Sequence, residues 1–182
     1  QFSFHDSAAP VARLLLLHGA GAPVQSAFFQ KLIPLLNAQG LSVVAANFNF
    51  MQQTLLGKRQ VAPKADKLLP ELEQLIAAIP ADDKLPLWLA GKSLGGRVVS
   101  MYLAGTQLAP AVAGGVVFGY PLCPPAKAKA AEKAALTVAV RSQCLQCLQR
   151  PLLLCQGSRD PFGSAESLRL VAGKAEVIEL TG

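Results

Sequence analysis

The sequence LPLWLAGKSLGGRVV, residues 85–99, decides the fold of this chain. It begins with an apolar run of about the length of one buried parallel strand, and it continues beyond Gly96 with residues that suit a helix. Its centre, Gly91-Lys92-Ser93-Leu94-Gly95, matches the pattern G-x-S-x-G, which is typical of a nucleophile elbow. In such an elbow the serine occupies a sharp strand-to-helix turn, and small residues on both sides let the strand and the helix approach closely. The stretch therefore predicts a Ser93 hydroxyl exposed above a parallel sheet.

A glycine-rich turn without any chemistry is the alternative explanation of the same pattern. Glycine and serine at ordinary frequencies match the three fixed positions by chance about 0.06 times in a chain of this size. The motif also has to follow an apolar strand and open a helix, and it does both. We therefore expect the elbow as architecture, whereas the reactivity of Ser93 depends on the partners that the rest of the chain supplies.

The composition restricts the class of protein. A chain of 182 residues suits one domain with a substantial core, so residues 1–182 are expected to form a single domain. Hydrophobic residues make up 52%, yet no apolar run approaches the roughly 18 residues of a membrane helix. A parallel sheet that is buried on both faces accounts for this excess. The first residues do not resemble a signal peptide, and we expect a cytoplasmic protein with no membrane partner.

Charge and cysteine content argue against two further classes of site. The formal net charge of +6 comes from basic residues that are scattered along the chain, so a solvated surface is expected rather than a nucleic-acid interface. Cys144 and Cys147 form one C-x-x-C, but no second ligand pair follows at the spacing of a zinc site. We therefore expect no metal and no cofactor, and the oligomeric state is left open.

Apolar runs that alternate with helical patterns predict the architecture. Helices are expected at 28–39, where Pro34 predicts a kink or a late start, and at 64–79, where Pro70 sits awkwardly. Residues 124–149 are harder to interpret: an exposed helix over 126–135 belongs either to a small lid or to an ordinary surface excursion. The pattern predicts a three-layer α/β fold, with a mostly parallel sheet of about six strands and helices on both faces. The expected strands are 11–17, 41–48, 85–90, 112–118, 152–156 and 175–180, with 2–4 as a remnant edge strand.

The strand at 11–17 leads into His18-Gly19-Ala20-Gly21, an H-G-x-G loop. Such a loop supplies one backbone N–H group of an oxyanion hole, and the residue after the nucleophile supplies the other. We therefore predict an oxyanion hole made by the N–H groups of Ala20 and Leu94. His18 is expected to brace the loop rather than to act as a base, and a plain strand-to-helix connection is the alternative.

The acid of a catalytic triad is expected at Asp160, in the loop after the strand at 152–156. The alternative is an ordinary turn aspartate before Pro161. In this arrangement the triad follows the order serine, acid, histidine, but the two histidines, His5 and His18, both precede Ser93. Either a histidine-bearing tail follows Gly182, or the protein keeps the fold without catalysis. We favour the tail, because a strand-to-loop boundary at Gly182 is where a G-x-x-H loop would begin.

Several basic residues fall in or beside the loops expected at the carboxyl edge of the sheet, where ligands bind in such folds. Lys58, Arg59 and Lys92 are candidates to bind an acidic substrate, together with His18 and Gly19 in the H-G-x-G loop. Arg97 and Arg159 fall in the same region. Surface charges or structural ion pairs are an equally good interpretation of these residues.

Five segments together resemble a family of small α/β-hydrolase-like proteins: LLLHGAGAP, NFNFM, AGKSLGGR, FGYPLCPP and QGSRDPFG. This family is related to dienelactone hydrolases, and it includes the testis-expressed and NSL-complex-subunit α/β-hydrolase-like proteins. The resemblance extends from about Val11 to the end of the chain. It implies an α/β-hydrolase fold with Ser93 as nucleophile, Asp160 as acid and a histidine after the last strand, which is where this sequence departs from the pattern.

The family's substrates are largely undefined, and some relatives act as complex subunits. We expect a serine hydrolase that cleaves an ester or a related acyl bond of a small molecule. A non-catalytic binding or scaffold protein is the alternative.

Overall fold

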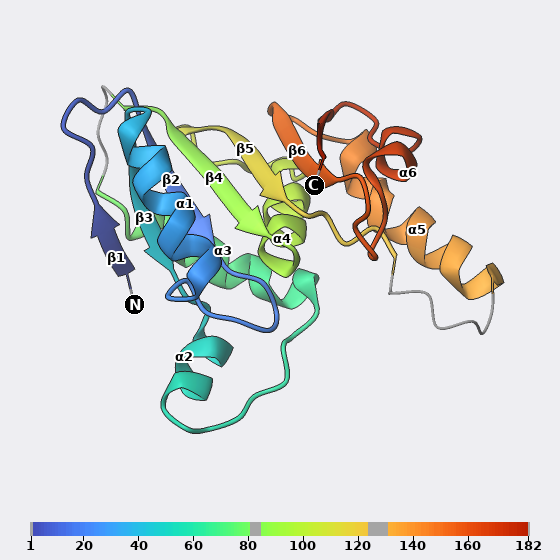
Figure 1. Cartoon of the computed structure of the whole chain (residues 1–182), viewed down its shortest axis with the longest axis horizontal. Coiled ribbons are helices and arrows are strands. Elements are labelled where there is room, and N and C mark those ends of the chain that lie inside the picture. The colour runs from blue at the N-terminus through green and yellow to red at the C-terminus, as the bar shows by residue number, and fades with distance from the viewer. Residues whose placement is uncertain (1, 81–84, 124–130, 182) are drawn as a thin grey trace.

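Seven strands form one sheet in the order β1-β3-β2-β4-β5-β6-β7 in the computed structural model, which describes residues 2–80, 85–123 and 131–181 (Figure 1). Strands β2 to β7 run parallel, and β1 pairs antiparallel with β3 at one edge. The predicted strands are confirmed, and the remnant edge strand is a full β1, which makes seven strands instead of about six. The strands are β1 Phe2–His5, β2 Ala12–Leu17, β3 Leu41–Ala46, β4 Leu87–Lys92, β5 Val112–Phe118, β6 Leu152–Gly157 and β7 Glu176–Leu180.

The helices follow the predicted pattern with two differences. The first helix begins at Ala27 and runs past Pro34, so the late start is wrong; Gln30, whose carbonyl loses its partner at Pro34, is exposed and can be solvated. No helix was predicted over 49–55, where α2 lies. Pro70 divides the predicted helix as expected, because it falls in the first turn of α3 after a short 3-10 helix. The helical elements are α1 Ala27–Ala38, α2 Asn49–Leu55, η1 Ala65–Leu68, α3 Leu69–Ala77, α4 Leu94–Leu103, α5 Ala131–Gln146 and α6 Ala165–Arg169.

Helices cover both faces of the sheet, which confirms the predicted three layers. Successive side chains of β2 point to opposite faces. Leu14 and Leu16 pack with Phe29 and Ile33 of α1 on one face, whereas Leu15 and Leu17 belong to a larger cluster with residues of α3, α4 and α5 on the other. In Figure 1, α1 lies in front of the strands, and α3 and α4 lie behind them.

The segment with the predicted exposed helix is described in part. Residues 126–130 lie outside the described residues, and 131–135 form the beginning of α5. This helix packs against α4, so its described part belongs to the helical layer opposite α1.

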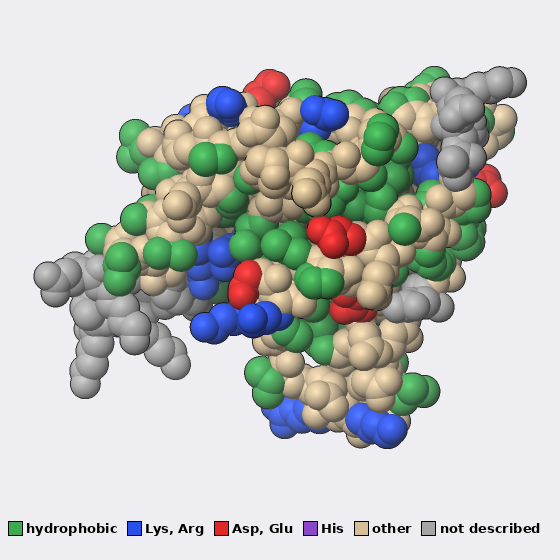
Figure 2. Space-filling model, turned by 180° about the vertical axis from the view of Figure 1, so that it is seen from behind, with side chains coloured by type: hydrophobic (Ala, Val, Ile, Leu, Met, Phe, Trp, Pro, Cys, Tyr) green, Lys and Arg blue, Asp and Glu red, His purple; other side chains and the backbone are tan. Residues whose placement is uncertain are grey.

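The surface seen from behind carries no concentrated charge. Figure 2 shows Lys and Arg side chains spread over this face, with Asp, Glu and apolar side chains between them. Within the described ranges, no helix has the length and apolar character needed to cross a bilayer.

Candidate active site

Ser93 stands in the sharp turn that the sequence predicts. Its backbone angles are φ 51° and ψ −111°, and it is the one non-glycine residue with positive φ among those that the structure describes. Such a conformation is strained for an L-residue and persists where its surroundings hold it. The Ser93 N–H donates a hydrogen bond to Phe118 O at 3.0 Å, and its carbonyl accepts one from the Arg97 N–H at 3.0 Å. The turn is therefore fixed between the end of β5 and the first turn of α4.

Three glycines around Ser93 allow β4, α4 and the neighbouring loops to approach one another. A Cβ on Gly91 would lie 2.3 Å from the carbonyl carbon of Gly95. A Cβ on Gly95 would lie 2.5 Å from His18 O, and one on Gly96 would lie 2.3 Å from Val117 Cγ1. No side chain fits at such separations, so the G-x-S-x-G-G pattern is explained by the packing of the turn.

The H-G-x-G loop lies directly against this turn. A Cβ on Gly19 would lie 3.3 Å from Lys92 O and 3.4 Å from Ser93 Cβ. Ala20, the next residue, is exposed, and Leu94 is the first residue of α4. Ala20 follows Gly19 in the chain, and Leu94 follows Ser93. Because Gly19 and Ser93 lie close together, the two predicted oxyanion-hole N–H groups are at neighbouring positions.

His18 is fully buried, and both its ring nitrogens have partners within the protein. Nε2 accepts a hydrogen bond from the Phe48 N–H at 2.9 Å, which leaves Nδ1 to donate to Gly19 O at 2.5 Å. Burial lowers the pKa of His18 below its ordinary value, so the imidazole is neutral at pH 7. The ring braces the loop between β2 and α1. Its side chain is not among the residues that line the hollow at Ser93, so the structure favours the bracing role over the predicted contact with a substrate.

Ser93 and Asp160 line one hollow of about 340 Å³. Lys92, predicted to bind the substrate, also lines it, and its Nζ lies 4.9 Å from the centroid of the Phe28 ring. Lys58 and Arg59 are exposed in the loop after α2 and are not among the lining residues, so the structure gives them no place at this hollow. The other lining residues are Phe28, Phe118, Gly119, Cys155, Gly157, Pro161, Phe162 and Leu180.

Three aromatic rings of this hollow were missed by sequence reasoning. Phe28 and Phe29 stand together at the beginning of the predicted helix, and the structure leaves Phe28 38% exposed whereas Phe29 is buried. The Phe28 ring packs edge-on against Phe118, with 6.0 Å between the ring centroids. Two consecutive aromatic residues at the beginning of a helix gave no signal of which one faces the site.

Asp160 lies in the loop after β6, as predicted. Its Oδ1 accepts a hydrogen bond from the Phe162 N–H at 2.8 Å, an arrangement that fixes the carboxylate within its own turn. Gly119, at the end of β5, has φ 67°, and a Cβ there would lie 3.3 Å from Asp160 Oδ2. The missing side chain at Gly119 therefore lets the acid reach the edge of the sheet beside the serine turn.

Gln156 holds the acid loop to the end of β5, a role that sequence reasoning missed. It is fully buried, and its Oε1 accepts a hydrogen bond from the Tyr120 N–H at 2.6 Å. Its Nε2 donates to Gly163 O at 2.6 Å and to Tyr120 O at 3.3 Å. The one available signal was a long polar side chain in an otherwise apolar strand.

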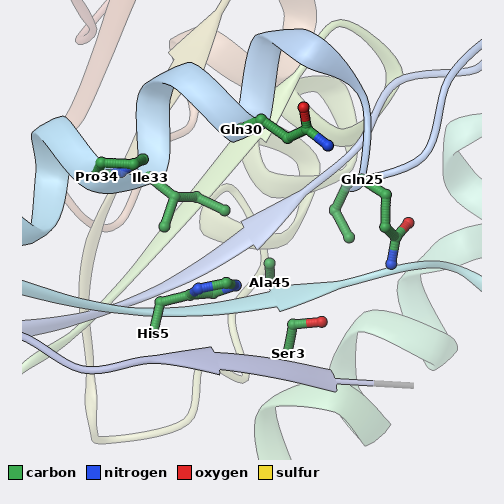
Figure 3. A pocket seen from close by; sticks show the side chains of 8 residues that line it. Ser3, His5, Gln25, Gln30, Ile33, Pro34 and Ala45 are labelled. Carbon is green, nitrogen blue, oxygen red and sulfur yellow. The ribbon is translucent and has the colours of Figure 1, made fainter.

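Neither histidine contributes to the hollow at Ser93. His5 lines a separate hollow of about 330 Å³ between β1 and α1, where Figure 3 shows its ring beside Ile33 and Ala45. At the hollow of Ser93, Leu180 at the end of β7 is a lining residue, and its carbonyl accepts a hydrogen bond from the Ser158 N–H at 3.0 Å. The end of β7 therefore lies beside the acid loop. No group of His, Cys, Asp or Glu side chains in the described part of the chain is arranged to hold a metal ion.

The comparisons with known proteins agree with this architecture. Est1E from Butyrivibrio proteoclasticus, solved with ferulic acid bound, is 12% identical and has a TM-score of 0.70, over 100% of this chain and 85% of that one. TT1662 from Thermus thermophilus is 20% identical, with a TM-score of 0.67, over 100% of this chain and 84% of that one. A monoacylglycerol lipase from Paleococcus ferrophilus is 17% identical, with a TM-score of 0.69, over 100% of this chain and 89% of that one.

At such identities these likenesses establish the fold. No curated protein matches the sequence. Residues 10–179, nearly the whole chain, match the family described as alpha/beta hydrolase domain. The chain belongs to the alpha/beta hydrolase domain family.

Proposed function

We propose that the protein is a serine hydrolase that cleaves an ester or a related acyl bond of a small molecule without a cofactor. The Ser93 hydroxyl attacks the carbonyl carbon, and the N–H groups of Ala20 and Leu94 stabilise the oxyanion. Asp160 orients a histidine that takes the serine proton and returns it to the leaving group. The observation that carries this proposal is the strained turn at Ser93. Ser93 and Asp160 line the same hollow, and Gly19 lies close to Ser93.

The general base is proposed to follow β7, beyond Gly182. Leu180 borders the hollow, and its carbonyl bonds to the acid loop through the Ser158 N–H. A residue that followed there would continue the chain from beside the hollow and the acid loop. This geometry supports a histidine there, in the order serine, acid, histidine.

An acyl or aryl group of modest size suits the hollow. Its volume is about 340 Å³, and the rings of Phe28, Phe118 and Phe162 form much of its apolar wall. Apolar walls with few polar groups are usual for small-molecule sites. The esterases and lipases among the similar structures support an ester as the substrate class. Of the basic residues considered for an acidic substrate, Lys92 is the one beside Ser93.

Hydrolysis of p-nitrophenyl butyrate by the full-length protein tests this function. The wild type is expected to turn over the ester, and Ser93→Ala is expected to remove turnover. Asp160→Asn is expected to lower kcat by about 10³–10⁴, because the histidine then loses its orienting acid. The double variant Lys58→Ala/Arg59→Ala is the control, and its turnover stays at the wild-type level. Turnover that survives in Ser93→Ala contradicts the proposal.

A binding or scaffold protein without turnover is the second candidate. The observation that favours it is that neither His5 nor His18 lines the hollow at Ser93. Full-length protein that hydrolyses no ester, and in which replacement of each histidine after β7 changes nothing, would establish this candidate instead. The cytoplasmic location stays a prediction of the sequence.

A further inference from the structure

Arg97 has a buried polar atom that the fold leaves without a partner. It lies one turn after Ser93 on α4, but it lines a second hollow, formed with η1, α3 and α5. Its Nε is buried and has no hydrogen-bond partner among the residues that the structure describes. A buried guanidinium N–H without an acceptor is costly, because water no longer solvates it.

A second guanidinium, that of Arg141 on α5, lies close enough to Arg97 for their charges to repel. The pKa of Arg141 is lowered, first by burial and then by the positive charge of Arg97. The Nη1 of Arg141 donates a hydrogen bond to Pro121 O at 2.7 Å, which fixes the side chain. In the described part of the chain, no carboxylate forms a salt bridge with either arginine.

The polar groups beside the two arginines do not neutralise them. Tyr120 Oη donates to Arg141 O at 2.5 Å and lies 3.6 Å from Cys144 Sγ. Burial raises the pKa of both Tyr120 and Cys144, so the phenol and the thiol stay uncharged at pH 7. Asp66 lines the same hollow, but its carboxylate is half exposed and lies 4.0 Å from Lys67 Nζ. Arg97 is therefore the one cation among the lining residues, and Arg141, which is not a lining residue, adds positive charge near it.

The hollow also has an apolar wall. Its volume is about 460 Å³, and Leu69, Met101 and Val140 lie among its lining residues. Gln143 and two thiols complete the lining, so the charged end is next to a surface that prefers hydrocarbon. The combination suits a molecule with one anionic end and an apolar body.

We propose that this second hollow binds a small molecule that carries an oxyanion, either a carboxylate or a phosphate, on an apolar body. The oxyanion pairs with the guanidinium of Arg97, which lines the hollow, and relieves the repulsion between the two guanidinium groups. The apolar body lies against Leu69, Met101 and Val140. The site does not use Ser93, so it stands whether or not the protein is a hydrolase.

Binding of phenyl phosphate to the full chain with Ser93→Ala tests this site, since that background has no catalytic serine. Calorimetry at constant ionic strength is expected to give tighter binding for phenyl phosphate than for inorganic phosphate, and tighter for both than for phenol. Benzoate is titrated in parallel, and its affinity relative to that of phenyl phosphate shows whether the hollow prefers a carboxylate or a phosphate group. Arg97→Met is expected to weaken phenyl phosphate binding at least tenfold, and Arg141→Met to weaken it less, because Arg141 is not a lining residue of the hollow. The control Arg59→Met, at an exposed arginine, leaves binding unchanged.

Thermal unfolding distinguishes a loss of ligand binding in Arg97→Met from a loss of folding. In buffer without phosphate or carboxylate, Arg97→Met is expected to keep or raise Tm, because it removes an Nε–H that is buried without an acceptor. Phenyl phosphate then raises Tm of the parent protein and not that of the variant. Absence of binding by the parent, binding by Arg97→Met as tight as that of the parent, or a lower Tm of Arg97→Met without ligand would each overturn the proposal.

Discussion

Gly19 lies so close to the serine turn that a Cβ there would be 3.4 Å from Ser93 Cβ and 3.3 Å from Lys92 O. The loop after β2 is thereby pressed against the turn after β4. This contact fixes the position of the Ala20 N–H group relative to the nucleophile. The position of Asp160 depends in the same way on the close approach of Gly119.

Gly19→Ala is expected to lower kcat/KM about tenfold or more, because a displaced oxyanion donor weakens transition-state binding. The added methyl moves the loop by a few tenths of an ångström away from Ser93. Ester hydrolysis and urea unfolding, measured together, separate this effect from a loss of stability. Gly21→Ala is the matched control, since a Cβ there meets nothing within 4 Å. Equal loss of activity in the two variants contradicts the assigned contact.

Gly119→Ala is expected to destabilise the protein by more than Gly57→Ala does. Both glycines have positive φ, 67° and 82°, so both substitutions carry the backbone penalty of about 1 kcal/mol. At Gly57 the new Cβ meets nothing within 4 Å, whereas at Gly119 it lies 3.3 Å from Asp160 Oδ2. Urea unfolding measures the difference, and kcat should fall in Gly119→Ala alone. Identical behaviour of the two variants would argue against the contact with Asp160.

Gln156→Leu is expected to cost about 2–3 kcal/mol of unfolding free energy, because it leaves buried backbone groups without partners. These are the Tyr120 N–H and the carbonyl of Gly163, which Gln156 now satisfies. Loss of this link also loosens the loop of Asp160, so kcat should fall. Gln74→Leu, at an exposed helical position, is the control and stays near the wild type. Unfolding midpoints that agree for both variants would remove the role assigned to Gln156.

His18 makes the stability depend on pH in a stated direction. Its pKa is lowered from 6.5 in the folded protein by burial, so the unfolded chain binds the proton more readily. The contribution of neutral His18 to the free energy of unfolding is complete above pH 6.5, the ordinary value, and is lost progressively as the pH falls below it. Urea unfolding between about pH 8 and about pH 5, a range around the usual histidine pKa of about 6.5, should show that the free energy of unfolding falls with pH.

The decline should be smaller in His18→Gln than in the wild type. His5→Gln leaves His18 in place and should keep the wild-type dependence on pH. The same slope in His18→Gln and in the wild type would show that another group is responsible.

The sequence predicted what depends on local pattern. Apolar runs marked each strand, and Gly91, Ser93 and Gly95 marked the turn, because the close approach of strand and helix admits few residue types. Pro70 marked the point where the predicted helix over 64–79 is divided, since proline suits the first turn of the helix that begins at Leu69.

Sequence reasoning failed where distant segments decide the outcome. Lys58 and Arg59 follow the strand β3 that ends at the correct edge of the sheet, but α2 intervenes and their loop does not line the hollow. Phe28 faces the site because the beginning of α1 lies near the end of β5, where its ring packs against Phe118, and no periodicity in its own helix reveals this. The role of Gln156 required the end of β5 and the acid loop to be seen together.

Labelling of full-length protein with a fluorophosphonate, followed by peptide mapping, tests the central claim that Ser93 is an activated nucleophile. The account predicts covalent modification at Ser93 near neutral pH, and much slower modification in Asp160→Asn. A full-length protein that carries no label on Ser93 at any pH near neutrality, under conditions that label a known serine hydrolase, would contradict it.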